Sequence, residues 1–493
     1  MQVFDLFVIG GGINGAGIAR DAAGRGLNVG LAEQDDFGGA TSSASSKLIH
    51  GGLRYLEHFE FRLVAESVAE REVLLRHAGH LIRPLEFVLP QAPDMRPAWM
   101  IRTGLWFYDY LGGHRSLPPS RAIRLDARAG YGKGLKPELK QAFTYWDAWV
   151  DDARLVIANL RSAAHHGGNL MPRTRFMDAQ VSGREWRIRL RLPDGEEQYC
   201  GASMLINAAG PWAGQVLRGM PTATRAQIRL VKGSHIVVPR IHDAPYAYIL
   251  QNADKRVLFI LPFEEDFSLI GTTEVTVQTP DGTTNISPEE TRYLIDAANA
   301  YLEKPLTEES VRWTYSGVRP LYEDGSRNSS KVTRDYTLKL ELRDGAPLLN
   351  IYGGKITTYR TLAEAALRKL SPWMNEKRGP WTAEESLPGS DFVSDATAAR
   401  ARLATQYAQL PPALLDVIFG RHGSESGKIL GDAATTEDLG MCFGAQLYER
   451  EVRHFIEHEW AQDAADILWR RTKAGLHMSD MQRRAFTTWF AQQ

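Results

Sequence analysis

The first residues of the chain combine two apolar segments with a glycine-rich turn. Residues 4–9 read FDLFVI, residues 10–15 read GGGING, and residues 16–25 have the composition of a helix. A second apolar run, residues 27–32, ends at Glu33. This order predicts a strand, a tight turn, a helix and a second strand, which together form a βαβ unit of about 30 residues.

The middle of the chain has the pattern of strands. Residues 186–192 alternate apolar residues with arginine and run into the turn PDG at 193–195, which predicts a hairpin. Three β-rich runs between residues 228 and 274 contain few helical signals, and we expect them to form one antiparallel sheet of a second domain. A last strand, 346–352, leads into a second glycine turn at 353–355.

Helical patterns occur in three other parts of the chain. Residues 62–75 have amphipathic spacing, and residues 357–370 follow the second glycine turn. Towards the C-terminus the composition shifts to alanine, leucine and paired charges, and we expect helices over 446–458 and 461–473. Residues 83–137 are instead broken by prolines around an aromatic cluster, which indicates an insertion into the nucleotide-binding fold.

Composition and charge are those of an ordinary globular protein. Of 493 residues 43% are apolar, and 58 Lys and Arg balance 59 Asp and Glu, so nothing global indicates a nucleic-acid partner. Cys200 and Cys442 match no metal-ligand spacing, so we expect neither a disulfide nor a metal site, in a reducing cytoplasm. Without a signal-peptide pattern or a run of about 18 apolar residues, we expect neither secretion nor a membrane span.

The first glycine turn has the spacing of a dinucleotide-binding motif. Gly10 permits the tight turn, Gly12 lets a pyrophosphate approach the backbone, and Gly15 lets helix and strand pack closely. Glu33, at the end of the second strand, can accept both hydroxyls of an adenosine ribose. A chance glycine turn is the alternative, but the complete strand, helix, strand and acidic end favour the motif.

The second glycine turn favours FAD over NAD. It opens a late helix whose positive end can face flavin N1 and the C2 carbonyl, where negative charge accumulates on reduction. A hydroxyl-rich segment after the second strand offers further donors to the cofactor, although a flexible linker would have a similar composition. Its candidate contacts are Thr41, Ser42, Ser45, Ser46 and Lys47. Asn14, Gly210, Gly354, Lys355 and Thr357 complete the predicted cofactor site.

Several longer strings make the sequence resemble a known family. They are IGGGINGAGIARDAAGRGL, TSSASSKLIHGGLRYLE, VDDARL, KGSHIVVPR, YSGVRPL, TRDYTL and YGGKITTYR, with a weaker match at LWRRTKAGL. They resemble the FAD-dependent glycerol-3-phosphate dehydrogenases, most closely the bacterial aerobic, respiratory type. The resemblance implies oxidation of sn-glycerol 3-phosphate to dihydroxyacetone phosphate by hydride transfer to flavin N5, with electrons passed to membrane quinone.

The resemblance also implies the organisation of the chain. We expect an α/β fold with an amino-acid-oxidase-like, Rossmann-like FAD-binding domain, an antiparallel-sheet substrate cap and a helical C-terminal domain. The expected ranges are 1–82, 138–215 and 335–388 for the FAD-binding domain, 83–137 and 216–334 for the cap, and 389–493 for the C-terminal domain. A homodimer, attached peripherally to the cytoplasmic face of the inner membrane, is implied as well.

Residues 96–124 are candidates for the membrane surface. They mix arginines with tryptophan, phenylalanine and aliphatic residues, which is typical of an interfacial surface. Aromatic residues buried inside the cap fit the same pattern equally well.

The substrate phosphate carries a charge of about −1.5 to −2 and is best held by guanidinium groups. Arg319 and Arg334 follow β-rich segments, and the resemblance places both in the substrate site. Arg54 and the adjacent Tyr55 are further candidates. The alternative is that these arginines only pair with nearby acidic residues.

Oxidation at C2 also requires a base that takes the hydroxyl proton. His235 is the first candidate, against the alternative of a half-buried histidine that only bonds the backbone. His50 competes as the base, because the resemblance places its glycine-rich loop along the flavin. Lys355 is expected to stabilise the reduced ring or to contact the hydroxyl.

Three other functions stay open from the sequence. One is an oxygen-reducing glycerol-3-phosphate oxidase, and another is an oxidoreductase of amino or 2-hydroxy acids with the same fold. The third is a non-catalytic flavoprotein scaffold, which would need neither the predicted arginines nor a base.

Overall fold

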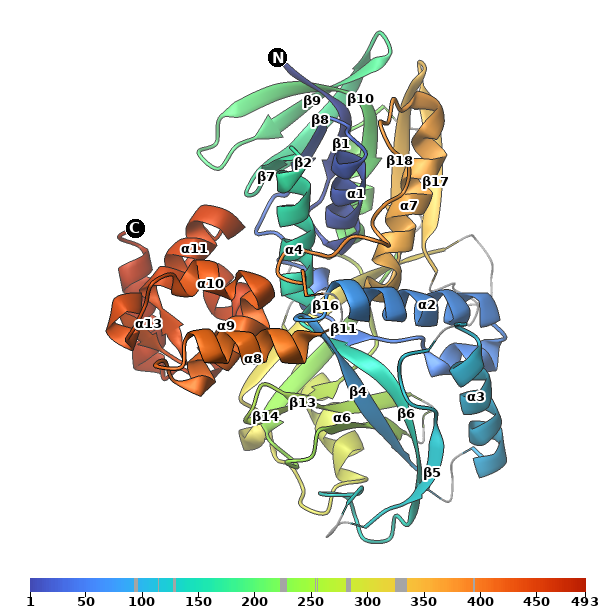
Figure 1. Cartoon of the computed structure of the whole chain (residues 1–493). Coiled ribbons are helices and arrows are strands. Elements are labelled where there is room, and N and C mark those ends of the chain that lie inside the picture. The colour runs from blue at the N-terminus through green and yellow to red at the C-terminus, as the bar shows by residue number, and fades with distance from the viewer. Residues whose placement is uncertain are drawn as a thin grey trace.

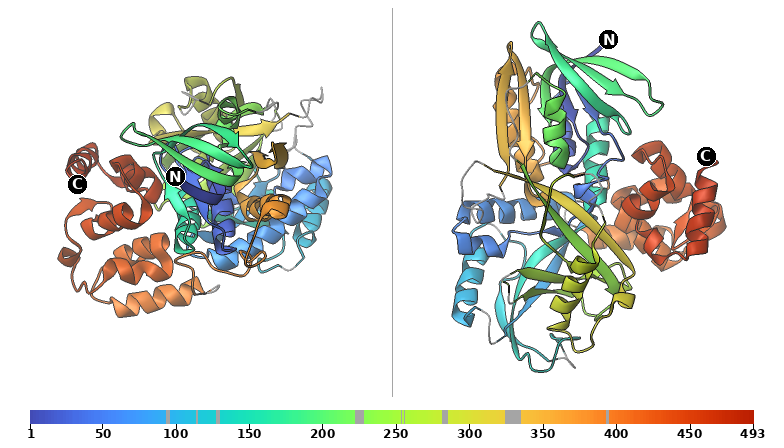
Figure 2. Two further views of the ribbon diagram at one scale, coloured as in Figure 1. Left: turned by 90° about the horizontal axis from the view of Figure 1, so that it is seen from above. Right: turned by 180° about the vertical axis from the view of Figure 1, so that it is seen from behind.

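Two large sheets and a helical C-terminal domain make up the molecule (Figure 1). The computed structural model describes residues 1–92, 96–113, 115–126, 130–221, 228–252, 254, 256–280, 285–323, 335–392 and 395–493. Seen from behind, the C-terminal domain and the helices α2 (Phe61–His77) and α3 (Ala98–Tyr110) lie on opposite sides of the molecule (Figure 2). The expected fold class is confirmed.

The first sheet has eight strands and contains the predicted βαβ unit. Its main order is β17-β18-β10-β1-β2-β7, and the pairs from β18 to β7 are parallel. The hairpin expected after residues 186–192 is present, since β9 pairs antiparallel with β10. The strands are β1 (Gln2–Ile9), β2 (Val29–Ala32), β7 (Asn169–Met171), β8 (Arg175–Ser182), β9 (Glu185–Arg191), β10 (Glu197–Asn207), β17 (Thr337–Arg343) and β18 (Ala346–Tyr352).

Three helices cover one face of this sheet (Figure 1). Helix α1 (Ile13–Gly24) lies between α4 (Asp152–His165) and α7 (Tyr359–Leu370), and packs against both. Their apolar side chains form one core with β1, β2, β10 and β18. This packing brings the first and last parts of the nucleotide-binding fold together, because α1 and α7 follow the two glycine turns.

The second sheet has ten strands. It runs in the order β15-β11-β14-β13-β12-β4-β6-β3, with β16 on β11 and β5 on β6. Helices α2 and α3 pack on one face of this sheet and α6 (Pro288–Asn299) on the other. The strands are β3 (Leu48–Ile49), β4 (Ile82–Pro90), β5 (Arg121–Arg124), β6 (Gln141–Val150), β11 (Ile228–Pro239), β12 (Tyr246–Gln251), β13 (Val257–Phe263), β14 (Phe267–Gly271), β15 (Val275–Val277) and β16 (Trp313–Tyr322).

Two features of this sheet differ from the sequence-based expectation. The sheet is not wholly antiparallel, because β12 pairs in parallel with β4. Strand β6 belongs to it too, although we assign residues 138–215 to the FAD-binding domain. Residue-by-residue pairing with β4, from Ile82 with Val150 to Pro90 with Ala142, holds β6 in this sheet.

The C-terminal domain is helical and has two separate apolar cores. The expected helix over 446–458 is present as α11 (Glu449–Glu459), but 461–473 is not one α-helix. A π-helix over Asp466–Arg471 takes its place, with Arg471 bound to Asp36 of the first domain. The other elements are α8 (Ala396–Gln406), α9 (Pro412–His422), α10 (Ser426–Leu430), β19 (Cys442–Gly444), β20 (Leu447–Tyr448), α12 (Ala474–His477) and α13 (Asp480–Phe490).

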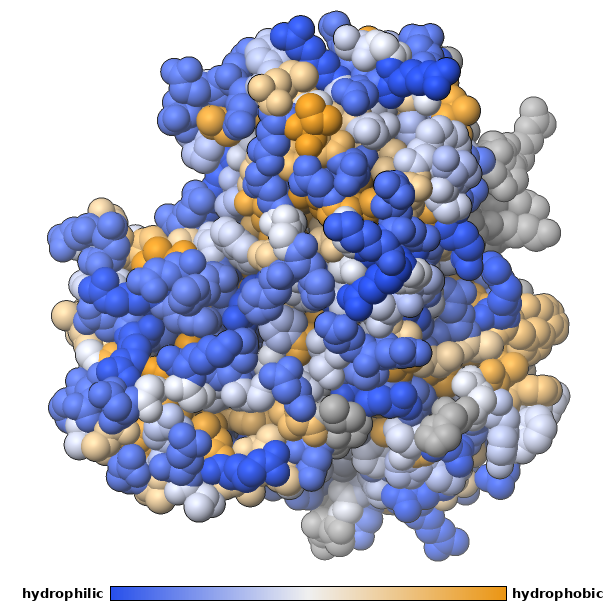
Figure 3. Space-filling view, turned by 45° about the horizontal axis from the view of Figure 1, so that its top comes forward, coloured by the Kyte–Doolittle hydropathy of each residue, from blue (hydrophilic) through white to orange (hydrophobic). Residues whose placement is uncertain are grey.

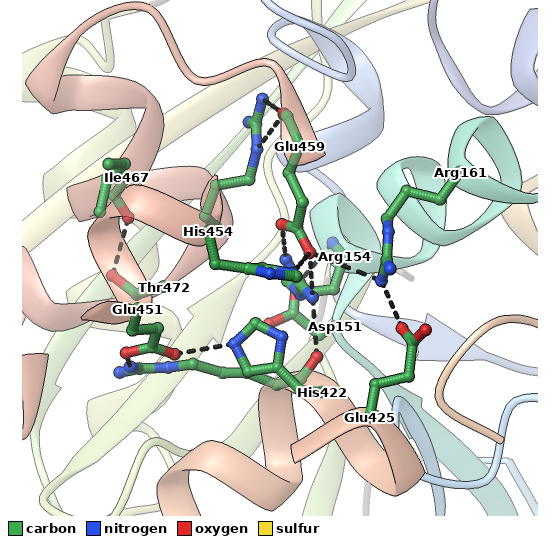
Figure 4. Close-up of polar contacts among 12 residues, drawn as sticks. Asp151, Arg154, Arg161, His422, Glu425, Glu451, His454, Glu459, Ile467 and Thr472 are labelled. Carbon is green, nitrogen blue, oxygen red and sulfur yellow. Dashed lines mark hydrogen bonds and ion pairs between the residues drawn. The ribbon is translucent and has the colours of Figure 1, made fainter. Parts of the chain in front are cut away.

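Buried ion pairs join this domain to α4 (Figure 4). Arg154 donates to both carboxylate oxygens of Glu459, and Arg161 donates to Glu425 at 2.6 Å. His422 and His454 lie beside Glu459, which makes the group resemble a set of metal ligands. The guanidinium of Arg154 already supplies the positive charge that a metal ion would bring, so we interpret the cluster as an ion-pair junction between domains.

Candidate active site

The turn between β1 and α1 fits the close backbone packing that the glycine motif predicts. Gly10 has a φ of +106°, and a Cβ there would lie 2.7 Å from the carbonyl oxygen of Ala208. A Cβ on Gly15 would lie 1.9 Å from the carbonyl oxygen of Gly10. A side chain at Gly10 would therefore clash with the segment that follows β10, and one at Gly15 would force α1 away from the turn. Gly12 is the residue just before α1, at the helix end that favours anions.

Glu33 is bound to the same turn. Its carboxylate accepts hydrogen bonds from the amides of Gly11, at 2.8 Å, and Asp35, at 2.9 Å. Burial raises the pKa of Glu33, although the two amides act in the opposite direction. The carboxylate lies beside the glycine turn, where the predicted ribose contact requires it.

The two glycine turns meet at one cavity of about 1010 Å³, counting its open mouth. The side-chain amide of Asn14 donates to the carbonyl oxygen of Gly353 at 3.1 Å, which joins the turns directly. Most of the lining comes from four parts of the chain: the turn at Gly10–Asn14, residues 33–42, residues 208–212 and the turn at Gly353 and Gly354. The cavity therefore gathers Gly10, Gly12, Asn14, Glu33, Thr41, Ser42, Gly210 and Gly354 of the predicted cofactor site.

Observations at this cavity fit a bound dinucleotide. The Oδ1 atom of Asn14 is buried and has no hydrogen-bond partner in the described parts of the chain. Gly354 has a φ of +97°, and a Cβ there would lie 3.1 Å from the side chain of Asn14. The walls thus offer a buried polar atom and a bare backbone, as an elongated cofactor with hydrogen-bonding groups requires.

The predicted hydroxyl segment divides into two parts. Ser42 accepts a hydrogen bond from the amide of Ile13 at 2.9 Å and lines the cavity with Thr41. Ser45 and Lys47 instead bind the carboxylate of Asp152 at the start of α4, at 2.7 Å each. These two side chains are engaged by the protein itself, so their predicted contact with the cofactor has no support in the geometry.

Lys355 lies at the start of the late helix, under an aromatic ring. Its ammonium is 3.9 Å from the ring centre of Tyr55 and donates no hydrogen bond within the described residues. Burial lowers the pKa of Lys355. Close by, the hydroxyl of Thr357 is 3.2 Å from the amide of His50. The structure therefore brings Lys355, Tyr55, Thr357 and His50 to one place, beside the second glycine turn.

His235 and Arg319 lie on neighbouring antiparallel strands of the second sheet. The pairs are His235 with Tyr315, Gly233 with Gly317, and Val231 with Arg319. Because alternate residues of a strand face the same side, both functional side chains point to one face of the sheet. Two glycines lie between them, and a Cβ on Gly233 would be 3.4 Å from the guanidinium of Arg319. The space above these glycines is occupied by neighbouring residues, since a Cβ on Gly233 would lie 2.7 Å from the hydroxyl of Thr272 and one on Gly317 would lie 3.0 Å from Ala44.

The surroundings of His235 keep its imidazole neutral. It is buried, stacks on Tyr315 at 4.8 Å, and shares a hydrogen bond of 2.9 Å with Ser46 through Nε2. Burial first, and then the charges of Arg319 and Lys47, hold the pKa of His235 well below its usual range. A neutral imidazole retains the lone pair that a general base needs.

Arg319 is half-exposed, and its guanidinium lies 3.8 Å from the carboxylate of Glu274. Pro320, the next residue of β16, lines the nucleotide cavity. The side chain of Arg54 and the whole of Arg334 lie outside the described residues.

Sequence reasoning did not find Asp152 and Tyr315. Both are buried and contact predicted site residues, Asp152 the hydroxyl segment and Tyr315 the ring of His235. The strings VDDARL and YSGVRPL contain them, but local sequence gives no sign of the partner that each contacts. Trp212 and Phe176 also line the nucleotide cavity without any signal in the glycine motif.

Comparison with known proteins identifies the class. A model described as FAD dependent oxidoreductase matches residues 5–360, and one described as the C-terminal domain of alpha-glycerophosphate oxidase matches 380–489. The chain therefore belongs to the FAD-dependent oxidoreductases, within the group that contains the glycerol-3-phosphate dehydrogenases. The cofactor expected from the second glycine turn, FAD, is confirmed.

Individual relatives agree with this class. The aerobic glycerol-3-phosphate dehydrogenase of Escherichia coli K12 is 48% identical over 100% of this chain and 98% of its own length. A D-erythritol 1-phosphate dehydrogenase of Brucella abortus is 46% identical over 99% of this chain and 98% of its own length. Among solved structures, a Bacillus halodurans glycerol-3-phosphate dehydrogenase complexed with FAD aligns at a TM-score of 0.74 and 22% identity, over 100% of this chain and 94% of that one. At this low sequence identity, the similarity to the Bacillus halodurans structure supports the fold alone.

Proposed function

We propose that this enzyme oxidises sn-glycerol 3-phosphate to dihydroxyacetone phosphate with FAD and passes the electrons to membrane quinone. The observation that carries the proposal is the arrangement of His235 and Arg319 on one face of the second sheet, with the pair Gly233 and Gly317 between them. A base and a cation at this spacing suit a short molecule with a hydroxyl and a phosphate. Near-complete alignment with relatives named for that substrate supports the choice.

The side chains divide the work between binding and proton transfer. Arg319 binds the phosphate, and the buried ammonium of Lys355 stabilises the developing negative charge. His235 takes the hydroxyl proton as the C2–H bond breaks and the carbonyl forms. FAD, when bound, supplies the two-electron acceptor for the C2 hydride. His50 remains the alternative base, near Lys355.

Anaerobic titration tests the reaction. Glycerol 3-phosphate should bleach the flavin absorbance of the purified protein, and D-erythritol 1-phosphate and a 2-hydroxy acid serve as matched comparisons. Bleaching by a 2-hydroxy acid alone would transfer the assignment to the acid oxidoreductases of this fold. Bleaching by the erythritol phosphate at a much lower concentration would assign the longer polyol phosphate instead.

The electron acceptor is tested in a second step. Addition of a short-chain quinone to the bleached protein should restore the flavin colour without oxygen. The rival is an oxidase, and a solved glycerophosphate oxidase of Mycoplasma pneumoniae does share the fold at a TM-score of 0.64. Undiminished turnover with stoichiometric peroxide in the absence of quinone would establish the oxidase instead.

We also propose that α3 docks on the membrane surface. Its outer side exposes Trp99 by 71% and Trp106 by 56%, with Phe107 and Tyr110 beside them, while Ile101 and Leu105 are buried. Hydrophobic side chains gather at the edge of the molecule on this side (Figure 3). Within the described parts of the chain, every helix is too short or too polar to cross a bilayer. Exposed tryptophan side chains on a helix are typical of the membrane–water interface.

Vesicle co-sedimentation tests this surface. The variant Trp99→Ser with Trp106→Ser should sediment far less with anionic vesicles than the wild type, while Tyr199→Ser, which changes an exposed aromatic residue of the first sheet, should not. Equal sedimentation of all three proteins would contradict docking through α3. Attachment to the cytoplasmic face and the homodimer remain part of the proposal, and light scattering of the detergent-solubilised protein measures the oligomeric state.

A further inference from the structure

A buried ion pair lies next to the active site, and the chemistry proposed above does not use it. The ammonium of Lys47 is 2.7 Å from Oδ1 of Asp152, and the two side chains are 1% and 0% exposed. Replacement of such a pair by apolar residues is often neutral or stabilising, so stability alone does not account for it. Lys47 also has a φ of +57°, an uncommon conformation for this residue type, which the surrounding contacts hold.

The pair fixes both ends of the segment Ser43–Lys47. Asp152 accepts the hydroxyl of Ser45 at 2.7 Å and its amide at 3.1 Å through Oδ2. Lys47 donates to the carbonyl oxygen of Ser43 at 3.0 Å. The segment is thereby bound to the start of α4, which packs in the core of the first domain.

The same segment holds the imidazole of His235 on two sides. At the edge, the hydroxyl of Ser46 is 2.9 Å from Nε2. On the face, Tyr315 stacks at 4.8 Å with an angle of 19° between the rings, and its hydroxyl donates to the carbonyl oxygen of Ser45 at 2.8 Å. The position of the ring therefore depends on Ser45 and Ser46, which the ion pair fixes.

We infer that Lys47 and Asp152 are positioning residues that orient His235 for proton abstraction. The inference rests on the proposed function, in which His235 is the base. Proton transfer requires the donor and the acceptor at hydrogen-bond distance, so rotation of the ring slows the step without removing any group that binds substrate.

The pair also contributes charge. Arg319 on β16 and Lys47 are the cations that lower the pKa of His235, after burial, and Tyr315 is the titratable ring stacked on it. Removal of the Lys47 ammonium should therefore raise the pKa of His235. The fall of the reduction rate at low pH, which is the acid limb of the pH profile, should then occur at higher pH. A purely structural role of the pair would not move that limb.

The test compares flavin reduction by glycerol 3-phosphate in the FAD-loaded, full-length wild type and in the double variant Lys47→Met with Asp152→Asn. The double variant leaves no unpaired charge, and Asn can still bind Ser45. We expect the limiting reduction rate to fall about tenfold or more, with KM and FAD content near the wild type and the acid limb at higher pH. The single variant Lys47→Arg keeps the cation and should retain the wild-type limb.

Glu425→Gln is the matched control, because Arg161–Glu425 is another buried ion pair of α4 and lies at the C-terminal domain. It should lower stability but leave the rate and the limb unchanged. Ser46→Ala keeps the ion pair, removes the contact to His235 and should reproduce the loss of rate if the double variant does not fold. A wild-type rate in either variant, or a wild-type limb in the double variant, would overturn the inference. A wild type that glycerol 3-phosphate does not bleach would overturn the proposed function instead.

Discussion

Burial changes the pKa of individual side chains in this site. His235 is neutral because it is buried beside cations, and Lys355 is an ammonium with a lowered pKa under an aromatic ring. Arg319 differs from both, because it is half-exposed and lies 3.8 Å from the carboxylate of Glu274. A guanidinium in this state can exchange its partner for a substrate anion at little cost.

Substitution of Arg319 by alanine should weaken substrate binding. Loss of a charged hydrogen bond costs about 1.5 to 3 kcal/mol, which corresponds to a rise in KM of roughly 10- to 150-fold. Steady-state kinetics with glycerol 3-phosphate measures the change. Arg62→Ala removes an arginine that is 85% exposed and should have no effect. An unchanged KM in Arg319→Ala would show that another residue holds the phosphate.

The pH profile should identify the base. Below its pKa an imidazole is protonated and accepts no proton. Because the pKa of His235 is lowered, kcat/KM should not change with pH around neutrality, and it should fall only below the usual imidazole pKa of about 6.5. His235→Asn should lower kcat/KM by about 10²- to 10⁴-fold. His50→Asn is the comparison, and a larger loss in that variant would assign the proton to His50.

Among helices and strands, the sequence predicted the elements that are determined by the spacing of nearby residues. Gly10, Gly12 and Gly15 revealed a strand, turn and helix, because Gly10 takes a φ of +106° and Gly15 packs against the carbonyl oxygen of Gly10 within the same turn. The partners of Lys47 were beyond this reasoning, since Asp152 is 105 residues away in the chain. The parallel pairing of β12 with β4 was also missed, because strand composition does not record the direction of a distant neighbour.

Helix α3 is connected to the loop that carries His50. The hydroxyl of Tyr108 donates to Asp147 and accepts the amide of Gly51 at 2.7 Å, in a buried position. Tyr108→Phe removes the acceptor of the Gly51 amide and one donor to Asp147, which keeps its ion pair with Arg71, and should lower the free energy of unfolding by about 1 to 3 kcal/mol. Chemical denaturation measures this change. Tyr110→Phe, on the exposed side of the same helix, should be neutral, and equal losses in both variants would contradict the assignment.

For the whole molecule, the junction of Figure 4 makes stability depend on pH. His422 is buried between α11 and the first domain, and burial lowers its pKa to about 4. Between about pH 4 and 6.5 the unfolded chain binds a proton at this histidine that the folded chain does not, so stability falls as pH falls through that window. Glu451, whose pKa is also lowered, contributes a loss of the same sign in more acidic solution.

The variant His422→Gln should reduce this pH dependence. It removes one titrating group and keeps a side chain able to bond with Glu451, so the slope of stability against pH should decrease by up to about 1.4 kcal/mol per pH unit. Denaturant unfolding at several pH values measures the slope. An unchanged slope would show that His422 does not titrate in this window.

The hydrogen bond between Asn14 and Gly353 spans 339 residues of chain. A ribosome makes the first wall of the dinucleotide pocket early, but the opposite wall emerges only after most of the protein has been synthesised. FAD can therefore be captured only late in biosynthesis, and a polypeptide truncated before Gly353 would leave the ribosome with its nucleotide groove open on one side.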